Sequence, residues 1–96
     1  MILVFDVGNT ETTVGLFDGE ALCGHWRVTT DVARTPDEIA LLIRSLLAAS
    51  DIDRHGINRA AIGSVVPALT APLAEACQQA VGATPLIISP KTWCLT

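Results

Sequence analysis

The sequence predicts an α/β domain with the element order β-β-β-α-β-α-β, in which helices pack on a mixed sheet. Three observations predict this fold class. Short apolar runs rich in β-branched residues fill the first third of the chain. Two later stretches repeat apolar residues at helical spacing, and a strand-like apolar run follows each of them. An antiparallel opening followed by helix-strand units places antiparallel and parallel strands in one sheet.

The first three predicted strands are residues 2–5, 12–17 and 22–30. The first is a continuous apolar run that ends at Asp6 and meets a turn at Gly8, which is the pattern of a buried strand. Between the second and third strands, Asp18 and Gly19 form a dipeptide that type I′ hairpin turns favour, because both central residues of that turn need a positive φ. The opening third is therefore predicted to be an antiparallel meander.

The first predicted helix begins after Thr35 and ends near Ser50. The Thr35 hydroxyl can accept from the backbone N–H of Glu38, the Glu38 side chain can reach back, and Pro36 suits the first helical position. The apolar residues that recur at i, i+3, i+4, i+7 and i+8 are Ile39, Leu42, Ile43, Leu46 and Leu47. One apolar stripe of this helix should therefore face the sheet.

The second half of the chain adds a strand, a helix and a strand. A polar connection at residues 51–58 leads to a strand at residues 60–66, which Pro67 should stop. The next helix has apolar residues at Leu69, Leu73, Cys77, Ala80 and Val81. Gly82 suits the carboxyl end of this helix, and residues 85–89 supply the last strand.

This element order is that of the ribonuclease H-like topology. We expect one domain at residues 1–90, followed by an irregular tail at residues 91–96 that has no periodicity. A length of 96 residues leaves no room for a second domain.

Composition argues against several classes of function. The formal charge is −4 and no basic run occurs, which argues against nucleic-acid binding. The longest apolar runs stop at Asp6 and Arg44, so we expect no membrane span, and the start lacks the pattern of a signal peptide. The 3 cysteines are widely spaced and lack metal-ligand spacing, which favours reduced structural thiols. A cytoplasmic protein is therefore expected.

The most informative stretch lies on the turn that joins the first two strands. It reads Asp6-Val7-Gly8-Asn9-Thr10-Glu11-Thr12-Thr13. Gly8 lets the backbone approach a ligand, and successive amides together with the threonine hydroxyls can face phosphate oxygens. Asp6, at the carboxyl end of a buried strand, is placed to hold Mg²⁺ directly or through water. The alternative is an ordinary tight turn, in which Asp6 caps the backbone and the threonines merely suit strands.

Neither Gly-x-x-x-x-Gly-Lys nor Gly-x-Gly-x-x-Gly occurs in the chain. The Asp-x-Gly-x-Thr pattern on a hairpin resembles instead the first phosphate motif of the actin, sugar-kinase and Hsp70 superfamily, whose members bind ATP between two ribonuclease H-like domains. Further short motifs resemble the type III pantothenate kinases in order and spacing, through about Thr92. These motifs are Asp6-Val7-Gly8-Asn9-Thr10, Asp18-Gly19, His25-Trp26-Arg27, Arg34-Thr35-x-Asp37-Glu38 and Ser64-Val65-Val66-Pro67.

The resemblance implies ATP-dependent phosphorylation of pantothenate to 4′-phosphopantothenate, the first step of coenzyme A biosynthesis. It implies that residues 6–13 bind the ATP phosphates, that Asp6 lies nearest Mg²⁺, that a monovalent cation (K⁺ or NH₄⁺) takes part, and that the protein is a homodimer. Glu11 departs from the family pattern, since many relatives carry Asn there. A carboxylate beside phosphates repels them unless it turns outward or meets the metal.

In the family, the acid that activates the pantothenate hydroxyl lies in a later Gly-Ala-Asp-Arg motif, which this sequence lacks. We therefore expect no catalytic acid in this chain, a second domain that is missing, and an amino-terminal half that is inactive alone. Two alternatives stay open. One is a nucleotide-responsive regulator of the same superfamily, and the other is a non-enzymatic half-domain that associates with itself.

Three other polar residues have competing interpretations. Ser64, at the end of a strand, either touches ligand in an interdomain cleft or bonds to the backbone as a buried hydroxyl. Arg34 either meets an anion or forms a solvated pair with Asp31 or Asp37. His25 has no neighbouring nucleophile, which favours a role in the strand surface.

Overall fold

The computed structural model describes residues 1–88. Their elements, in chain order, are β1 (Ile2–Val7), β2 (Glu11–Asp18), β3 (Ala21–Thr29), α1 (Pro36–Ala49), the short 3₁₀ helix η1 (Arg54–Gly56), β4 (Arg59–Ser64), α2 (Pro67–Val81) and β5 (Leu86–Ile88). The predicted element order is confirmed. The carboxyl end of the predicted last strand, the domain boundary at residue 90 and the tail at 91–96 lie outside the described residues.

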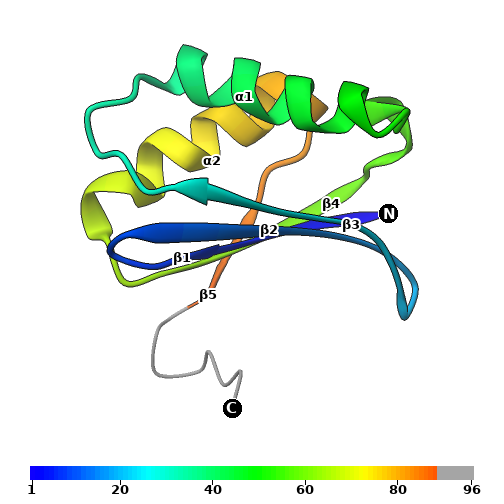
Figure 1. Ribbon diagram of the computed structural model, residues 1–96, viewed down its shortest axis with the longest axis horizontal. Coiled ribbons are helices and arrows are strands. Elements are labelled where there is room, and N and C mark those ends of the chain that lie inside the picture. Colours follow the sequence, from blue (N-terminus) through cyan, green and yellow to red (C-terminus); the bar gives the residue numbers. More distant parts are fainter. Residues whose placement is uncertain (89–96) are drawn as a thin grey trace.

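The five strands form one sheet in the order β3-β2-β1-β4-β5. The β1–β2 and β2–β3 pairs are antiparallel, whereas the β1–β4 and β4–β5 pairs are parallel. Both helices cover the same face of this sheet (Figure 1). The mixed sheet predicted from the element order is therefore confirmed, because each strand-helix-strand unit returns parallel to its first strand.

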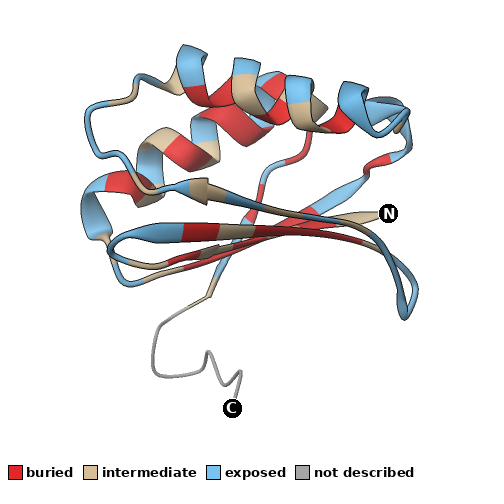
Figure 2. Cartoon of the chain, viewed as in Figure 1, coloured by how far each residue is buried: buried red, intermediate tan, exposed pale blue. Residues whose placement is uncertain are grey.

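The core lies between the sheet and the two helices (Figure 2). Strand β1 alternates, so that Leu3, Phe5 and Val7 are buried while the residues between them are half-buried. Successive side chains of a strand point to opposite faces. Asp6 therefore lies on the face of the sheet that no helix covers within residues 1–88.

Helix α1 begins as its sequence predicts. The Thr35 hydroxyl accepts from the Glu38 backbone N–H at 3.2 Å, and the Thr35 N–H donates to Glu38 Oε1 at 2.9 Å. The pKa of the Glu38 carboxyl lies below its ordinary value, because the Thr35 backbone N–H and then the Thr35 hydroxyl stabilise the charged carboxylate. The capping box thus positions the start of the helix directly after the β3–α1 connection.

Two local predictions were wrong. Strand β4 ends at Ser64 rather than at residue 66, because Pro67 begins α2 instead of merely stopping the strand. In the β2–β3 hairpin, Asp18 pairs with Ala21, so Gly19 and Glu20 are the central residues. Gly19 has φ +62° and Glu20 has no positive φ, which is the pattern of a type II′ turn rather than type I′.

The two cysteines within residues 1–88 differ in exposure. Cys23 is exposed, whereas Cys77 on α2 is fully buried, and burial raises the pKa of the Cys77 thiol to about 11.

Because the folded state holds the proton of the Cys77 thiol more tightly than the unfolded state, we expect the free energy of unfolding to fall as pH rises from about 9 to about 11. Urea unfolding across this range measures the effect, and Cys77→Ala should flatten the pH dependence. A slope that Cys77→Ala leaves unchanged would contradict the assignment.

Candidate functional site

The connection between β1 and β2 is a tight loop. The Gly8 N–H donates to the Glu11 carbonyl oxygen at 3.0 Å, and both Asn9 and Thr10 at the tip are exposed. A Cβ atom at Gly8 would lie only 2.9 Å from that same Glu11 oxygen, which is backbone and cannot move aside. Glycine is therefore needed here for a close approach of two backbone segments.

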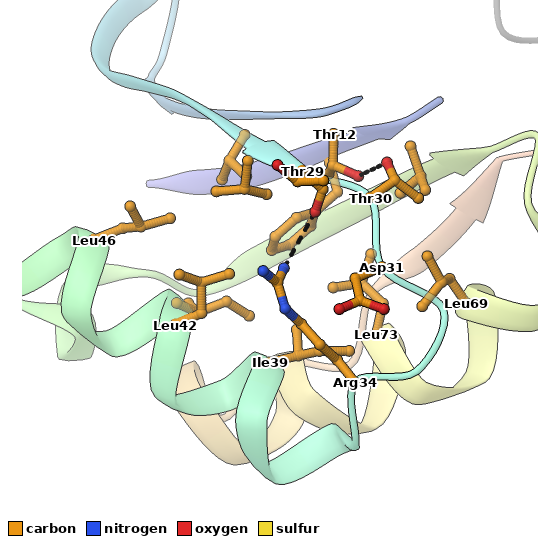
Figure 3. Close-up of a pocket in the computed structure, with 15 residues that line it drawn as sticks. Thr12, Thr29, Thr30, Asp31, Arg34, Ile39, Leu42, Leu46, Leu69 and Leu73 are labelled. Carbon is orange, nitrogen blue, oxygen red and sulfur yellow. Dashed lines mark hydrogen bonds between the residues drawn. The ribbon is translucent and has the colours of Figure 1, made fainter. Parts of the chain in front are cut away.

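The residue after β3 holds this loop from the side of the core. The Thr30 N–H donates to the Thr10 carbonyl oxygen at 2.9 Å, and the Thr30 hydroxyl donates to the Gly8 carbonyl oxygen at 2.7 Å. The hydroxyls of Thr12 and Thr30 are 2.8 Å apart (Figure 3). The sequence alone predicts Thr30 only as the end of a strand. The antiparallel pairing of the second and third strands could have indicated this contact, because it places the end of the third strand beside the start of the second.

Strand alternation places two pairs of the predicted site residues on opposite faces of the sheet. Val7 and Thr12 lie opposite each other and are buried on the helix side. Asp6 and Thr13 also lie opposite each other, on the uncovered face. Directly opposite residues have Cβ atoms about 5 Å apart, so a carboxylate and a hydroxyl stand side by side there. The Thr12 hydroxyl, in contrast, is engaged by Thr30.

The carboxyl ends of β1 and β4 lie together beside the loop. Val7 pairs with Ser64, and the Val65 N–H donates to the Val7 carbonyl oxygen at 3.1 Å. The start of α2 lies at the same end of the sheet as the β1–β2 loop (Figure 1). The Ser64 hydroxyl donates to the Val66 carbonyl oxygen at 3.1 Å and accepts from the Val66 N–H at 3.0 Å. These contacts agree with the interpretation of Ser64 as a hydroxyl bonded to the backbone.

The Glu11 carboxylate is directed toward β3. Its Oε1 lies 3.9 Å from Nε of Arg27, and both side chains are more than half exposed. A solvated pair at this distance contributes little to stability. The pair matters for the charge near the loop, because the Arg27 guanidinium partly neutralises the Glu11 carboxylate.

Asp6 can take part in holding a magnesium ion. Within residues 1–88 no group of three or more His, Cys, Asp or Glu side chains is arranged to bind a metal. Mg²⁺ commonly keeps several waters and binds through one or two carboxylates together with substrate phosphates. Gly63, which pairs with Asp6 on its other side, adds no side chain that would crowd the carboxylate. The residues present therefore fit a magnesium ion shared with a nucleotide.

A cavity of about 50 Å³ lies between the sheet and the helices. Its walls are mainly apolar; Thr12 and Thr30 lie on the strand side, and Arg34 comes from just before the start of α1 and points toward Thr29 (Figure 3). Ligand pockets usually exceed about 300 Å³, whereas this space suits only a water or two. Arg34 donates to the Thr29 carbonyl oxygen at 3.2 Å, which neither of its two interpretations anticipated. The cavity is therefore too small to hold a nucleotide.

Comparison with known proteins places the chain in a family. A sequence profile described as Type III pantothenate kinase matches residues 2–95. The chain belongs to the type III pantothenate kinase family. It is 41% identical over 90 residues to a type III pantothenate kinase of Syntrophotalea carbinolica and 41% identical over 90 residues to one of Halalkalibacterium halodurans. Each alignment covers 94% of this chain and 35% of the relative. The chain therefore spans about one third of the length of the curated relatives that it matches.

Solved structures agree on the fold of this type III pantothenate kinase family member. A putative N-acetylglucosamine kinase from Porphyromonas gingivalis aligns with a TM-score of 0.67 at 21% identity, over 93% of this chain and 34% of that one. A ROK hexokinase from Thermus thermophilus aligns with a TM-score of 0.62 at 16% identity, over 92% and 33%. YeaZ from Pseudomonas aeruginosa aligns with a TM-score of 0.58 at 15% identity, over 92% and 43%. The predicted ribonuclease H-like, actin-like ATPase fold is thereby confirmed.

Proposed function

We propose that this chain supplies the ATP phosphate-binding part of a type III pantothenate kinase, which transfers the γ-phosphoryl group of ATP to pantothenate. The single observation that carries the proposal is the β1–β2 loop, which Gly8 and Thr30 close and which leaves its tip exposed. Membership of the family supports the use of ATP and pantothenate. The family resemblance supports the product, 4′-phosphopantothenate, and a role in coenzyme A biosynthesis.

Within this proposal, residues 6–13 serve the nucleotide in three ways. Backbone amides of the loop face phosphate oxygens, Asp6 binds Mg²⁺ directly or through water, and Thr13 offers its hydroxyl beside Asp6. The buried pair Val7 and Thr12 supports the loop from below. Phosphoryl transfer depends mainly on positioning and on neutralising charge, which is what Mg²⁺ supplies when bound.

Several finer expectations are proposals supported by the resemblance alone. They are the monovalent cation, K⁺ or NH₄⁺, the homodimer, the cytoplasmic location and the role of a second domain that carries the catalytic acid. No helix within residues 1–88 is long and apolar enough to cross a membrane. We propose that the 96-residue chain alone does not phosphorylate pantothenate, because the Gly-Ala-Asp-Arg motif is absent from its sequence.

A chimera tests this division of labour. The matched 90-residue segment of the Syntrophotalea carbinolica relative is replaced by the corresponding segment of this chain. We expect the chimera to form phosphopantothenate from ATP and pantothenate, and the 96-residue chain to form none. Clear turnover by the chain alone would overturn the two-part proposal. A chimera that folds by circular dichroism but stays inactive would overturn the proposed site.

A second candidate function, the self-associating half-domain, is favoured by the uncovered face of the sheet. Strand register and alternation place on it the apolar residues Ile2, Val4, Phe17, Leu22, Ala61, Leu86 and Ile88. Leu22 is 56% exposed and Leu86 is 67% exposed. Exposed contiguous apolar surface commonly marks an interaction site. Light scattering of the 96-residue chain decides, since a monomer at all concentrations would remove this candidate.

A further inference from the structure

Thr30 contacts the β1–β2 loop through two separate groups. Its backbone N–H donates to the Thr10 carbonyl oxygen at 2.9 Å, and its hydroxyl donates to the Gly8 carbonyl oxygen at 2.7 Å. These two acceptors flank Asn9, the exposed tip of the loop. One residue therefore holds both halves of the loop.

The Thr30 hydroxyl is in turn held by Thr12. A hydroxyl has one proton, and Thr30 gives its proton to Gly8, so Thr12 must be the donor in the 2.8 Å contact between the two hydroxyls. Thr12 is 7% exposed. The result is a directed chain of two hydrogen bonds, from Thr12 through Thr30 to Gly8, at the border of the core. Hydrogen bonds in such surroundings are stronger than in water.

The direction of these carbonyl groups determines where the neighbouring amides point. In a planar trans peptide unit the C=O and the following N–H point in opposite directions. Since the carbonyls of Gly8 and Thr10 face Thr30, the N–H groups of Asn9 and Glu11 point away from it. Backbone N–H groups that a turn directs outward in this way commonly bind phosphate oxygens.

We propose that Thr30 is a positioning residue for nucleotide binding, which orients the amides of Asn9 and Glu11 by holding the carbonyls that precede them. The inference rests on the proposed function, because it takes the β1–β2 loop as the site of the ATP phosphates. Thr30 does not touch the nucleotide and acts only through the loop backbone.

Three variants of the 96-residue chain separate this role from general stability. Thr30→Val keeps the shape but removes the hydroxyl, and Thr30→Ser keeps the hydroxyl. Thr29→Val is the matched control, because Thr29 is exposed and its hydroxyl makes no hydrogen bond within the described residues. Two readouts by NMR are needed. One is amide hydrogen exchange at Gly8 without nucleotide, and the other is affinity for Mg·ATP from amide shifts of residues 8–13.

Thr30→Val removes the bonds to Gly8 and from Thr12, but only the bond to Gly8 holds the loop. We therefore expect it to weaken Mg·ATP binding roughly threefold to tenfold and to speed Gly8 exchange by a similar factor. Thr30→Ser should restore both values to within about twofold. Thr29→Val should change neither. The amide of Phe5 in the core should exchange at an unchanged rate in all three variants.

Three outcomes would overturn the proposal. Faster exchange at Phe5 equal to that at Gly8 would make Thr30 a residue of general stability. Unchanged affinity in Thr30→Val, with intact binding by the unmodified chain, would refute the positioning role alone. If the unmodified chain binds no Mg·ATP, the three variants are compared in the chimera by KM for ATP: an unchanged KM in Thr30→Val refutes the positioning role, and a folded but inactive chimera refutes the loop as a phosphate site and with it the proposed function.

Discussion

Asp6→Asn in the active chimera is expected to lower kcat/KM for ATP by about 100-fold or more, which corresponds to about 2.7 kcal/mol of transition-state stabilisation. The amide has the shape of the carboxylate but lacks the charge that attracts Mg²⁺ and its water shell. Asp6 is half-buried on the uncovered face, between Thr13 and Gly63, so the substitution leaves the core unchanged. Steady-state kinetics at several Mg²⁺ concentrations measures the effect.

Asp18→Asn is the matched control for this prediction. Asp18 lies at the other end of the same hairpin and is exposed. It carries the same charge, so its removal tests whether net charge alone alters activity. We expect activity within about twofold of the parent chimera, since an exposed distant charge is largely screened. Equal losses in the two variants, or full activity in Asp6→Asn, would show that Asp6 has no role at the metal.

The second large effect is expected in the core. Phe5→Ala should lower the free energy of unfolding by about 3 to 5 kcal/mol, because it removes a large buried side chain and leaves a cavity. Phe5 is 1% exposed and is among the largest fully buried side chains. Marginal domains have only about 5 to 15 kcal/mol of stability, so much of the total would be lost. Urea unfolding monitored by circular dichroism gives the value.

Phe17→Ala provides the comparison, because Phe17 lies half-buried on the uncovered face of the same sheet. We expect it to cost less than half as much as Phe5→Ala. A loss as large as that of Phe5→Ala would mean that something covers this face in solution, which is the outcome that the self-associating candidate requires. The pair of variants thus measures which face of the sheet is the interior one.

Much of the fold could be predicted from the sequence, because local chemistry decides it. The Thr35 capping box, the helical spacing of apolar residues in α1 and α2, and the continuous apolar run of β1 each depend on residues near one another in the chain. The close turn at Gly8 is also local, because the contact that requires glycine is made with Glu11, three residues away. These features predicted both the element order and the position of the candidate loop.

Strand register decided the features that sequence reasoning missed. Thr12 and Thr13 look equivalent in the sequence but lie on opposite sides of the sheet. The pairing with neighbouring strands decides which of them faces the core, because a change of one residue in register would exchange the two faces. The link from Thr30 to Gly8 spans 22 residues, and only the paired strands bring those groups together. The sequence by itself determined which segments are strands, helices and turns. Only the tertiary structure decided which side chains face the loop, the core or solvent, because those directions depend on partners that are distant in the chain.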